Sequence, residues 1–206
     1  DLWQVLGASQ GDYQRIIVAP KDAMDAYNCM PELFNLTDKY QCPGIVVSDL
    51  LISEGRFSFD PDNVDLHPKI DRGDLISTPS SSGGYKRYQY TESGISPRAM
   101  PGLEGFVHVV ATDEHDEDST LISDEFTHPH KRQRMVEKRA RKFEATLQDI
   151  APPELEGPAD AQVTLLGWGS TYGAIFGAVK KLCHLGKATA GIHLRNIHPL
   201  PLDLGD

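Results

Sequence analysis

Short apolar runs alternate with a longer amphipathic stretch in the N-terminal quarter of the chain. Residues 15–20 (RIIVAP) are rich in β-branched side chains and end in proline, which is typical of a strand buried on both faces. Residues 22–40 carry apolar side chains at helical spacing behind Asp22, a good N-cap residue, although Pro31 predicts a kink or a break into two helices. Residues 44–51 (GIVVSDLL) predict a second buried strand. Strand, helix and strand at this spacing indicate a βαβ unit with parallel strands.

The middle of the chain loses this periodicity. Residues 53–105 are dense in Pro, Gly, Ser and Asp, most of all in 77–85 (STPSSSGGY). A loop of this length inside a domain is generally functional or disordered. Residues 106–111 (FVHVVA) predict a return to a strand.

An amphipathic helix is predicted for residues 130–150. Its apolar positions fall near one face, and basic side chains cover the remainder. The apolar set is Val136, Ala140, Phe143, Leu147 and Ile150, and the basic set is Lys131, Arg132, Arg134, Lys138, Arg139, Arg141 and Lys142. We interpret this as a surface helix docked on a core rather than a nucleic-acid site.

A second strand–helix–strand pattern follows an acidic, Pro-rich linker at residues 151–160 (APPELEGPAD). Residues 162–170 predict a strand that ends in a glycine turn, 171–186 a helix stopped by Gly186, and 188–201 the next strand. The whole pattern predicts an α/β fold in two units, 1–150 and 161–206.

Composition and charge narrow the classes of function. The chain of 206 residues has a net charge of −10, which argues against nucleic acid or an anionic membrane as the main partner. No stretch reaches the roughly 20 apolar residues of a membrane-spanning helix. Three scattered cysteines cannot alone form a disulfide framework, a zinc site or an iron–sulfur site, and they favour a reducing, cytoplasmic compartment. The chain begins without Met or a signal-peptide pattern, so we expect a piece of a longer protein.

Three local motifs carry candidate chemistry. The acidic run 113–118 (DEHDED), with His128 and His130, could ligate a metal, but it fails the EF-hand spacing and is better interpreted as a solvated acidic loop. The glycines of 167–173 depart from G-x-G-x-x-G and favour a tight strand-to-helix turn over a phosphate site. Cys183 and His184 are neighbours on a helix, so their side chains diverge, and a packed cysteine is the better interpretation. We therefore assign no catalytic, cofactor-binding or metal-binding residue.

The string YKRYQYTESGISPRAMPG at residues 85–102 resembles the alpha subunit of 2-oxoacid:ferredoxin oxidoreductases, most closely the 2-oxoglutarate type. Other segments resemble the same subunit in order. Residues 1–28 are similar to the middle of its pyrimidine-side thiamine diphosphate domain, and 43–56 to the strand that follows. Residues 111–118 and 130–143 are similar to its exit segment and long connecting helix. Residues 162–175 are similar to the opening of its transketolase C-terminal-like domain. The resemblance thus equates 1–150 with the first domain and 161–206 with the start of the second.

The resemblance implies an activity and its cofactors. The family couples oxidative decarboxylation of a 2-oxoacid, with CoA, to the reduction of ferredoxin. Thiamine diphosphate lies between subunits, and a beta subunit binds its diphosphate through Mg²⁺ and holds an iron–sulfur cluster. The resemblance therefore implies an oligomer with a beta subunit as partner, and with CoA and ferredoxin reached through the complex. The family's pyrimidine-contacting glutamate and substrate loops match positions upstream of Asp1, so we expect this chain alone to be inactive and to bind no cofactor.

Ser93, Ser96 and Arg98 are the candidate substrate or interface residues, because they lie in the most family-like tract. Arg98 stands between two prolines, and arginine binds carboxylates bidentately, so we expect this tract to face the partner subunit or the active-site cleft. The alternative is an arginine that pins the loop by binding carbonyls or a local acid. At the level of the whole chain, the alternative to an oxidoreductase subunit is a non-catalytic α/β module that only binds partners.

Overall fold

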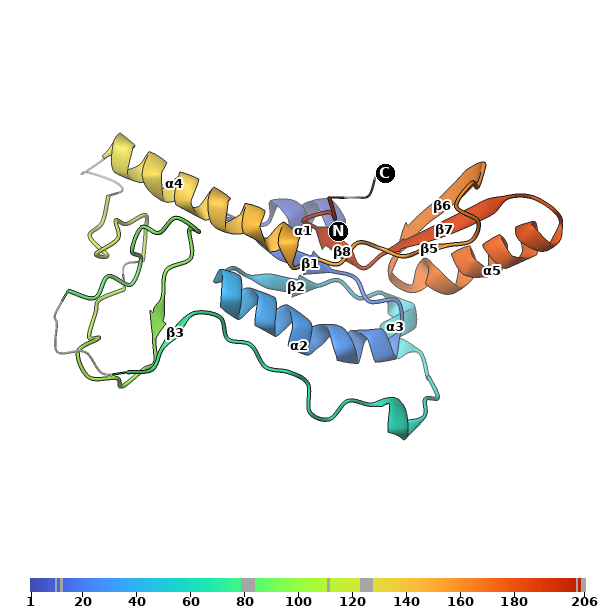
Figure 1. The fold of residues 1–206 in the computed structure, drawn as a ribbon, viewed down its shortest axis with the longest axis horizontal. Coiled ribbons are helices and arrows are strands. Elements are labelled where there is room, and N and C mark those ends of the chain that lie inside the picture. Colours follow the sequence, from blue (N-terminus) through green and yellow to red (C-terminus); the bar gives the residue numbers. More distant parts are fainter. Residues whose placement is uncertain are drawn as a thin grey trace.

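The computed structural model describes residues 1–9, 11, 13–78, 84–110, 112–122, 128–202 and 204. Two small sheets with their helices lie along the longest axis of the molecule, and a long irregular segment runs past α2 and reaches α4 (Figure 1). The fold is α/β, as the sequence predicts.

The first sheet has the order β2-β1-β8. β1 (Ile16–Val18) is parallel to β2 (Gly44–Val46), and α2 (Ala23–Tyr40) connects them, which confirms the predicted βαβ unit. Alternation along β1 sends Ile16 and Val18 towards α2, and Ile17 towards a second cluster that includes α1 (Leu2–Gly7). Ile16 and Ile17 are completely buried, so the sheet is covered on both faces.

Several sequence predictions about this unit were wrong in detail. α2 runs unbroken through Pro31, because Cys29 and Leu33 on either side of it are buried against β1. The second strand stops at Val46, and α3 (Leu50–Glu54) takes up the rest of the predicted run. Residues 106–110 form no strand, and Ala111 lies outside the described residues. Val107 is 96% exposed, so its β-branched side chain has nothing to pack on.

Residues 55–78 form a belt along the outer side of α2. Asn35 donates to the Lys69 carbonyl at 2.7 Å, and Tyr27 donates to the Asp65 carbonyl at 3.0 Å. The belt ends in β3 (Leu75–Ile76), which pairs in parallel with β4 (Arg98–Ala99). The predicted long loop is therefore attached to α2 by hydrogen bonds at intervals.

α4 (Pro129–Glu144) and the 3₁₀ turn Ala145–Gln148 replace the single predicted helix 130–150. Its most buried positions within the helix are Met135 and Lys138, so the predicted division into an apolar and a basic face was wrong. Phe143 packs on the first core cluster, and Tyr40 donates to Asp149 at 2.8 Å. These contacts join the βαβ unit to α4 and to the residue that follows the 3₁₀ turn.

The second sheet has the order β5-β7-β6. β6 (Val163–Trp168) is parallel to β7 (Thr189–Leu194) through α5 (Tyr172–His184), as predicted. β5 (Leu155–Glu156) lies inside the predicted linker and pairs with β7. β8 (Asn196–His198) follows β7 but pairs with β1 of the first sheet. The two domains remain a prediction, and this strand pairing joins them.

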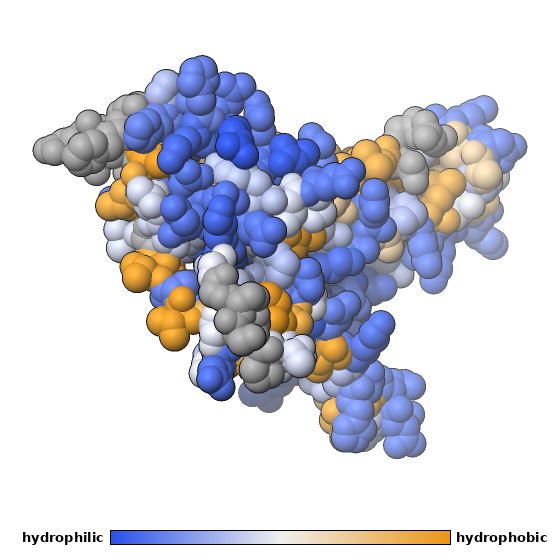
Figure 2. Space-filling view, turned by 60° about the vertical axis from the view of Figure 1, so that its left-hand side comes forward, coloured by the Kyte–Doolittle hydropathy of each residue, from blue (hydrophilic) through white to orange (hydrophobic). Residues whose placement is uncertain are grey.

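The surface mixes polar and apolar side chains. Figure 2 shows a largely hydrophilic face with hydrophobic residues in several separate places. Phe34 on α2 is 65% exposed, and Val163 and Leu166 on β6 are also exposed. Among the helices of the described residues, none is both long and apolar enough to cross a membrane.

Candidate functional site

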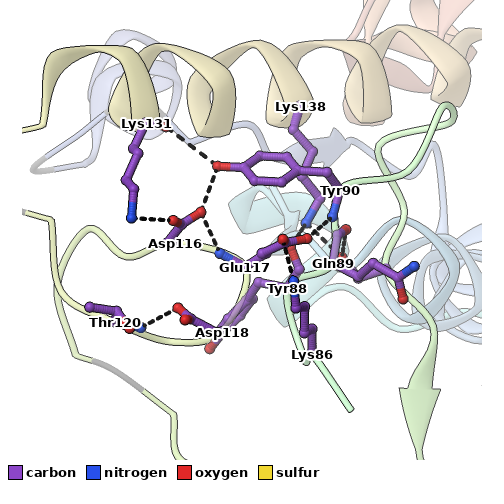
Figure 3. A network of polar contacts seen from close by, with 11 residues as sticks. Lys86, Tyr88, Gln89, Tyr90, Asp116, Glu117, Asp118, Thr120, Lys131 and Lys138 are labelled. Atoms are coloured by element: carbon purple, nitrogen blue, oxygen red, sulfur yellow. Dashed lines mark hydrogen bonds and ion pairs between the residues drawn. The ribbon is translucent and has the colours of Figure 1, made fainter. Parts of the chain in front are cut away.

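The family-like tract 85–102 and the acidic run 113–118 both dock on α4, and their polar side chains form one network (Figure 3). At its outer end, the Tyr90 hydroxyl donates to Asp116 at 3.0 Å, and Lys131 pairs with the same carboxylate at 2.8 Å. Burial alone would raise the pKa of Asp116, but hydrogen bonds from Lys131, the Glu117 amide and Tyr90 outweigh it and lower the pKa. Burial and the Asp116 carboxylate raise the pKa of Tyr90 to about 12.

Two other acids of this run, Glu117 and Glu114, are paired as well. Glu117 accepts from Lys86 at 2.6 Å and from the Tyr90 amide at 3.2 Å. Glu114 binds Arg139 of α4 bidentately at 2.8 and 2.9 Å, which lowers the pKa of the Glu114 carboxyl. The interpretation of 113–118 as a solvated loop was therefore wrong for Glu114, Asp116 and Glu117, because the first two pair with cations of α4 and Glu117 pairs with Lys86. Asp113 and Asp118 are exposed.

Ser96 lies at the inner end of the network. It is buried, donates to the Gln89 carbonyl at 2.9 Å and accepts from Lys138 at 2.6 Å. Lys138 also donates to the Tyr88 carbonyl at 2.8 Å. Burial, followed by the charges of Lys142 and other neighbouring cations, lowers the pKa of Lys138 to about 8. Lys138 was missed from the sequence, because helical periodicity places a lysine beside apolar positions without showing what faces it.

Arg98 turns away from α4 towards α2. Its guanidinium pairs with Asp38 at 3.2 Å and donates to the Arg72 carbonyl at 2.9 Å. These are the contacts expected for a loop-pinning arginine. Ser93 is exposed, and its hydroxyl accepts from the Ile95 amide at 3.2 Å. The structure therefore holds Ser96 and Arg98 at two different helices and leaves Ser93 at the surface, so the three candidates do not converge on one point.

The glycine turn after β6 makes a contact within the chain. Asp49, at the N-terminus of α3, accepts from the Ser170 amide at 2.9 Å, and Gly169 adopts φ of 60°. Hydrogen bonding to Ser170 lowers the pKa of Asp49. The turn thus receives a carboxylate of this chain, in keeping with the tight-turn interpretation.

The remaining motifs form no evident centre. Across the described ranges, no three His, Cys, Asp or Glu side chains are grouped to hold a metal ion. Cys183 is exposed and its thiol lies 3.1 Å from the Thr189 carbonyl, so its interpretation as a packed cysteine was wrong. The three cysteines, at positions 29, 42 and 183, likewise form no set of ligands for an iron–sulfur cluster.

These elements define an α/β segment in which a βαβ unit, a loop docked on a connecting helix and a second parallel unit follow one another. No family model matches the chain. A similar architecture occurs in the 2-oxoglutarate:ferredoxin oxidoreductase of Magnetococcus marinus, whose structure has 2-oxoglutarate, coenzyme A and succinyl-CoA bound. The similarity has a TM-score of 0.77 at 29% identity and covers 98% of this chain and 34% of that one.

Curated proteins give the same assignment. A 2-oxoacid:ferredoxin oxidoreductase alpha subunit of Aeropyrum pernix is 32% identical over 98% of this chain and 31% of its own length. The 2-oxoglutarate oxidoreductase subunit KorA of Mycobacterium tuberculosis is 29% identical over 100% of this chain and 30% of its own length. The chain is thus a homologue of part of the 2-oxoacid:ferredoxin oxidoreductase alpha subunits, which confirms the resemblance. It spans about a third of the length of these relatives.

Proposed function

We propose that this chain is part of the alpha subunit of a 2-oxoglutarate:ferredoxin oxidoreductase. The enzyme would decarboxylate the 2-oxoacid oxidatively, transfer the acyl group to CoA and pass the electrons to ferredoxin. The observation that carries the proposal is similarity over 98% of the chain, in sequence and in fold, to oxidoreductases of this kind. The order of segments agrees as well, because the relatives align along one continuous stretch rather than at isolated motifs.

Within this function, the chain acts as a scaffold and not as the source of the reacting groups. Thiamine diphosphate, when bound in the complete enzyme, supplies the carbanion chemistry. Across the described residues no three potential metal ligands are grouped, and the resemblance supports assigning the Mg²⁺ clamp of the diphosphate, together with an iron–sulfur cluster, to a beta subunit. The chain alone is then expected to be inactive, and its partners are the beta subunit, CoA and ferredoxin.

The loop carrying Ser93, Ser96 and Arg98 has two roles in this proposal. Ser96 and Arg98 position the loop, because each binds a helix of its own chain. Ser93, which precedes both, is exposed and is the member that can face a partner subunit or the cleft. The proposal therefore places recognition at Ser93 and loop geometry at Ser96 and Arg98.

The decisive test is an assay of the alpha subunit that contains this chain, purified with its beta subunit. We expect reduction of ferredoxin or a low-potential dye that depends on both CoA and 2-oxoglutarate, with weaker activity on pyruvate. The 206-residue chain alone is expected to give no such activity and no calorimetric signal with thiamine diphosphate and Mg²⁺. Dye reduction that does not depend on any 2-oxoacid would contradict the proposal, and so would micromolar binding of the cofactor by the isolated chain.

One observation favours a second function, a partner-binding module without catalysis. Phe34 on α2, and Val163 and Leu166 on β6, expose apolar side chains that suit contacts with another protein surface. An enzyme subunit also needs such contacts. The two functions are separated by the same assay, since a module would form a complex with a partner but confer no dependence on a 2-oxoacid.

A further inference from the structure

A cavity of about 200 Å³ lies between the docked loop and α4, at the inner end of the polar network. Its volume exceeds the roughly 10–15 Å³ that one water molecule needs on the same measure. Four basic side chains line it: Arg87 from the loop, and Lys138, Arg139 and Lys142 from α4. The cavity therefore gathers positive charge from two separate parts of the chain.

Most of this charge is not neutralised by carboxylates. Arg139 binds Glu114. Within the described ranges, Arg87, Lys138 and Lys142 have no carboxylate within ion-pair distance. Their partners are uncharged oxygens instead: Lys142 donates to the Gln41 carbonyl at 2.8 Å, and Arg87 to the Gln41 side-chain oxygen at 3.0 Å.

Burying these cations without an anion costs free energy. Burial is the main cause that lowers the pKa of both Lys138 and Lys142. Repulsion from Lys142 lowers the pKa of Lys138 further, and repulsion from Arg139 and Arg87 lowers that of Lys142. Buried charges in proteins are generally paired or bound to a ligand. Lys142 and Arg87 each use one donor in the contacts above, and an ammonium has three and a guanidinium five. Donors thus remain on both sides of the cavity.

We propose that this cavity binds a phosphate group, held between Arg87 and Lys142, with Lys138 adding positive charge beneath it. Several donors converging from two elements suit a tetrahedral oxyanion, which has acceptor atoms in every direction, better than a planar carboxylate. The excess charge suits an anion that carries more than one negative charge. The site does not depend on the oxidoreductase function, because it rests only on the geometry of this chain.

The test combines a local and a global measurement on the purified protein. Lysine labelling by acetic anhydride, read by peptide mass spectrometry, is expected to fall at Lys142 when inorganic phosphate replaces chloride at equal ionic strength. The exposed Lys181 on α5 is the internal control and is expected to label equally in both salts. Because labelling is read at one side chain, phosphate bound elsewhere does not affect the result.

Variants give the second measurement. Phosphate is expected to raise the melting temperature of the wild type, and Lys142→Gln or Arg87→Gln is expected to weaken the apparent affinity roughly tenfold, the effect of one charge-assisted hydrogen bond. Lys181→Gln, which makes the same change of charge, is expected to keep the wild-type affinity for phosphate. Equal protection at Lys142 and Lys181, equal loss in all three variants, or tighter binding of malonate than of phosphate would overturn the proposal.

Discussion

Lys138 and Arg98 illustrate how the partners of a cation decide its role. Arg98 meets the carboxylate of Asp38 and a carbonyl, so its charge is compensated where the loop crosses α2. Lys138 is only 5% exposed and meets two uncharged oxygens. The partners of these two cations cannot be predicted from the sequence, because they depend on how the 85–102 loop folds back on the helices.

The lowered pKa of Lys138 is expected to make the free energy of unfolding depend on pH. Its folded-state pKa of about 8 lies below the unfolded value of about 10.4, so the unfolded chain binds more protons between these pH values. The contribution of Lys138 to the free energy of unfolding therefore rises with pH across this window. The neighbours that set it are Lys142, Arg87, Arg139 and Glu117, in addition to burial.

The measurement is urea unfolding of the wild type and Lys138→Met at several pH values from 7 to about 10 in phosphate-free buffer. The stability of the wild type relative to the variant is expected to increase above pH 8. The same substitution at Lys181 serves as the control for removing a lysine. If the difference in the free energy of unfolding between wild type and variant stays constant or falls with pH, burial does not lower the pKa of Lys138.

The pairing of Arg98 with Asp38 is testable by a double-mutant cycle. Both side chains are partly exposed, at 21% and 32%, so we expect a coupling energy of only about 0.5–1 kcal/mol. Each single substitution also removes a second contact, because Arg98 donates to the Arg72 carbonyl and Asp38 pairs with the Arg72 side chain at 2.8 Å, so only the coupling energy reports on the pair itself. Additive effects of the two substitutions, measured by thermal unfolding, would remove the loop-pinning role.

At the scale of elements, the sequence predicted the helices and strands whose apolar side chains recur at regular spacing. Both parallel strand–helix–strand units were predictable, because buried strands separated by an amphipathic helix leave few other arrangements. The break predicted at Pro31 does not occur, because core contacts keep α2 continuous. The strand predicted at residues 106–110 does not form, because no facing strand exists for it among the described residues. In both places packing outweighs the local preference of the sequence. The candidate tract was identified by family resemblance, whereas its contacts required the structure.

At Gly94 the loop backbone packs directly against α4. It adopts φ of 78°, and a Cβ here would collide with the Lys138 carbonyl and the Lys142 backbone. Gly94→Ala is therefore expected to lower the free energy of unfolding by at least about 2 kcal/mol. Gly102 has a similar φ of 86° with open space around it, so Gly102→Ala should cost only about 1 kcal/mol.

Comparing the two alanine variants by chemical unfolding separates backbone strain from close packing. Equal losses would mean that φ alone matters and that the loop does not press on α4. A larger loss at Gly94 would support a tightly docked loop.

At the scale of the molecule, the connections differ in how firmly they are held. Within the described ranges, residues 107–110, which follow a turn at 104–105, make no backbone-to-backbone hydrogen bonds, and Val107 is almost fully exposed. The predicted linker 151–160, by contrast, contributes β5 to the second sheet. The apparent boundary between the units is therefore better protected than a segment within the first one.

Limited digestion with proteinase K, followed by mass spectrometry, should reflect this difference. We expect the earliest cut among the described segments within 107–110, and later cleavage within 151–160, because a protease needs an extended, unpaired backbone. Val107→Pro, which stiffens the exposed backbone, is expected to slow the first cut. Primary cleavage within 151–160 would instead favour an independent linker and two separately folded domains.

The pairing of β8 with β1 has a consequence for the order of folding. Ile17 and His198 are register partners although most of the chain lies between them. β1 is the middle strand of its sheet, so one of its edges stays open during synthesis until the ribosome has released residues 196–198. Contacts so distant in sequence close large loops and form slowly. One edge of β1 therefore stays unpaired until β8, near the other end of this chain, has been synthesised.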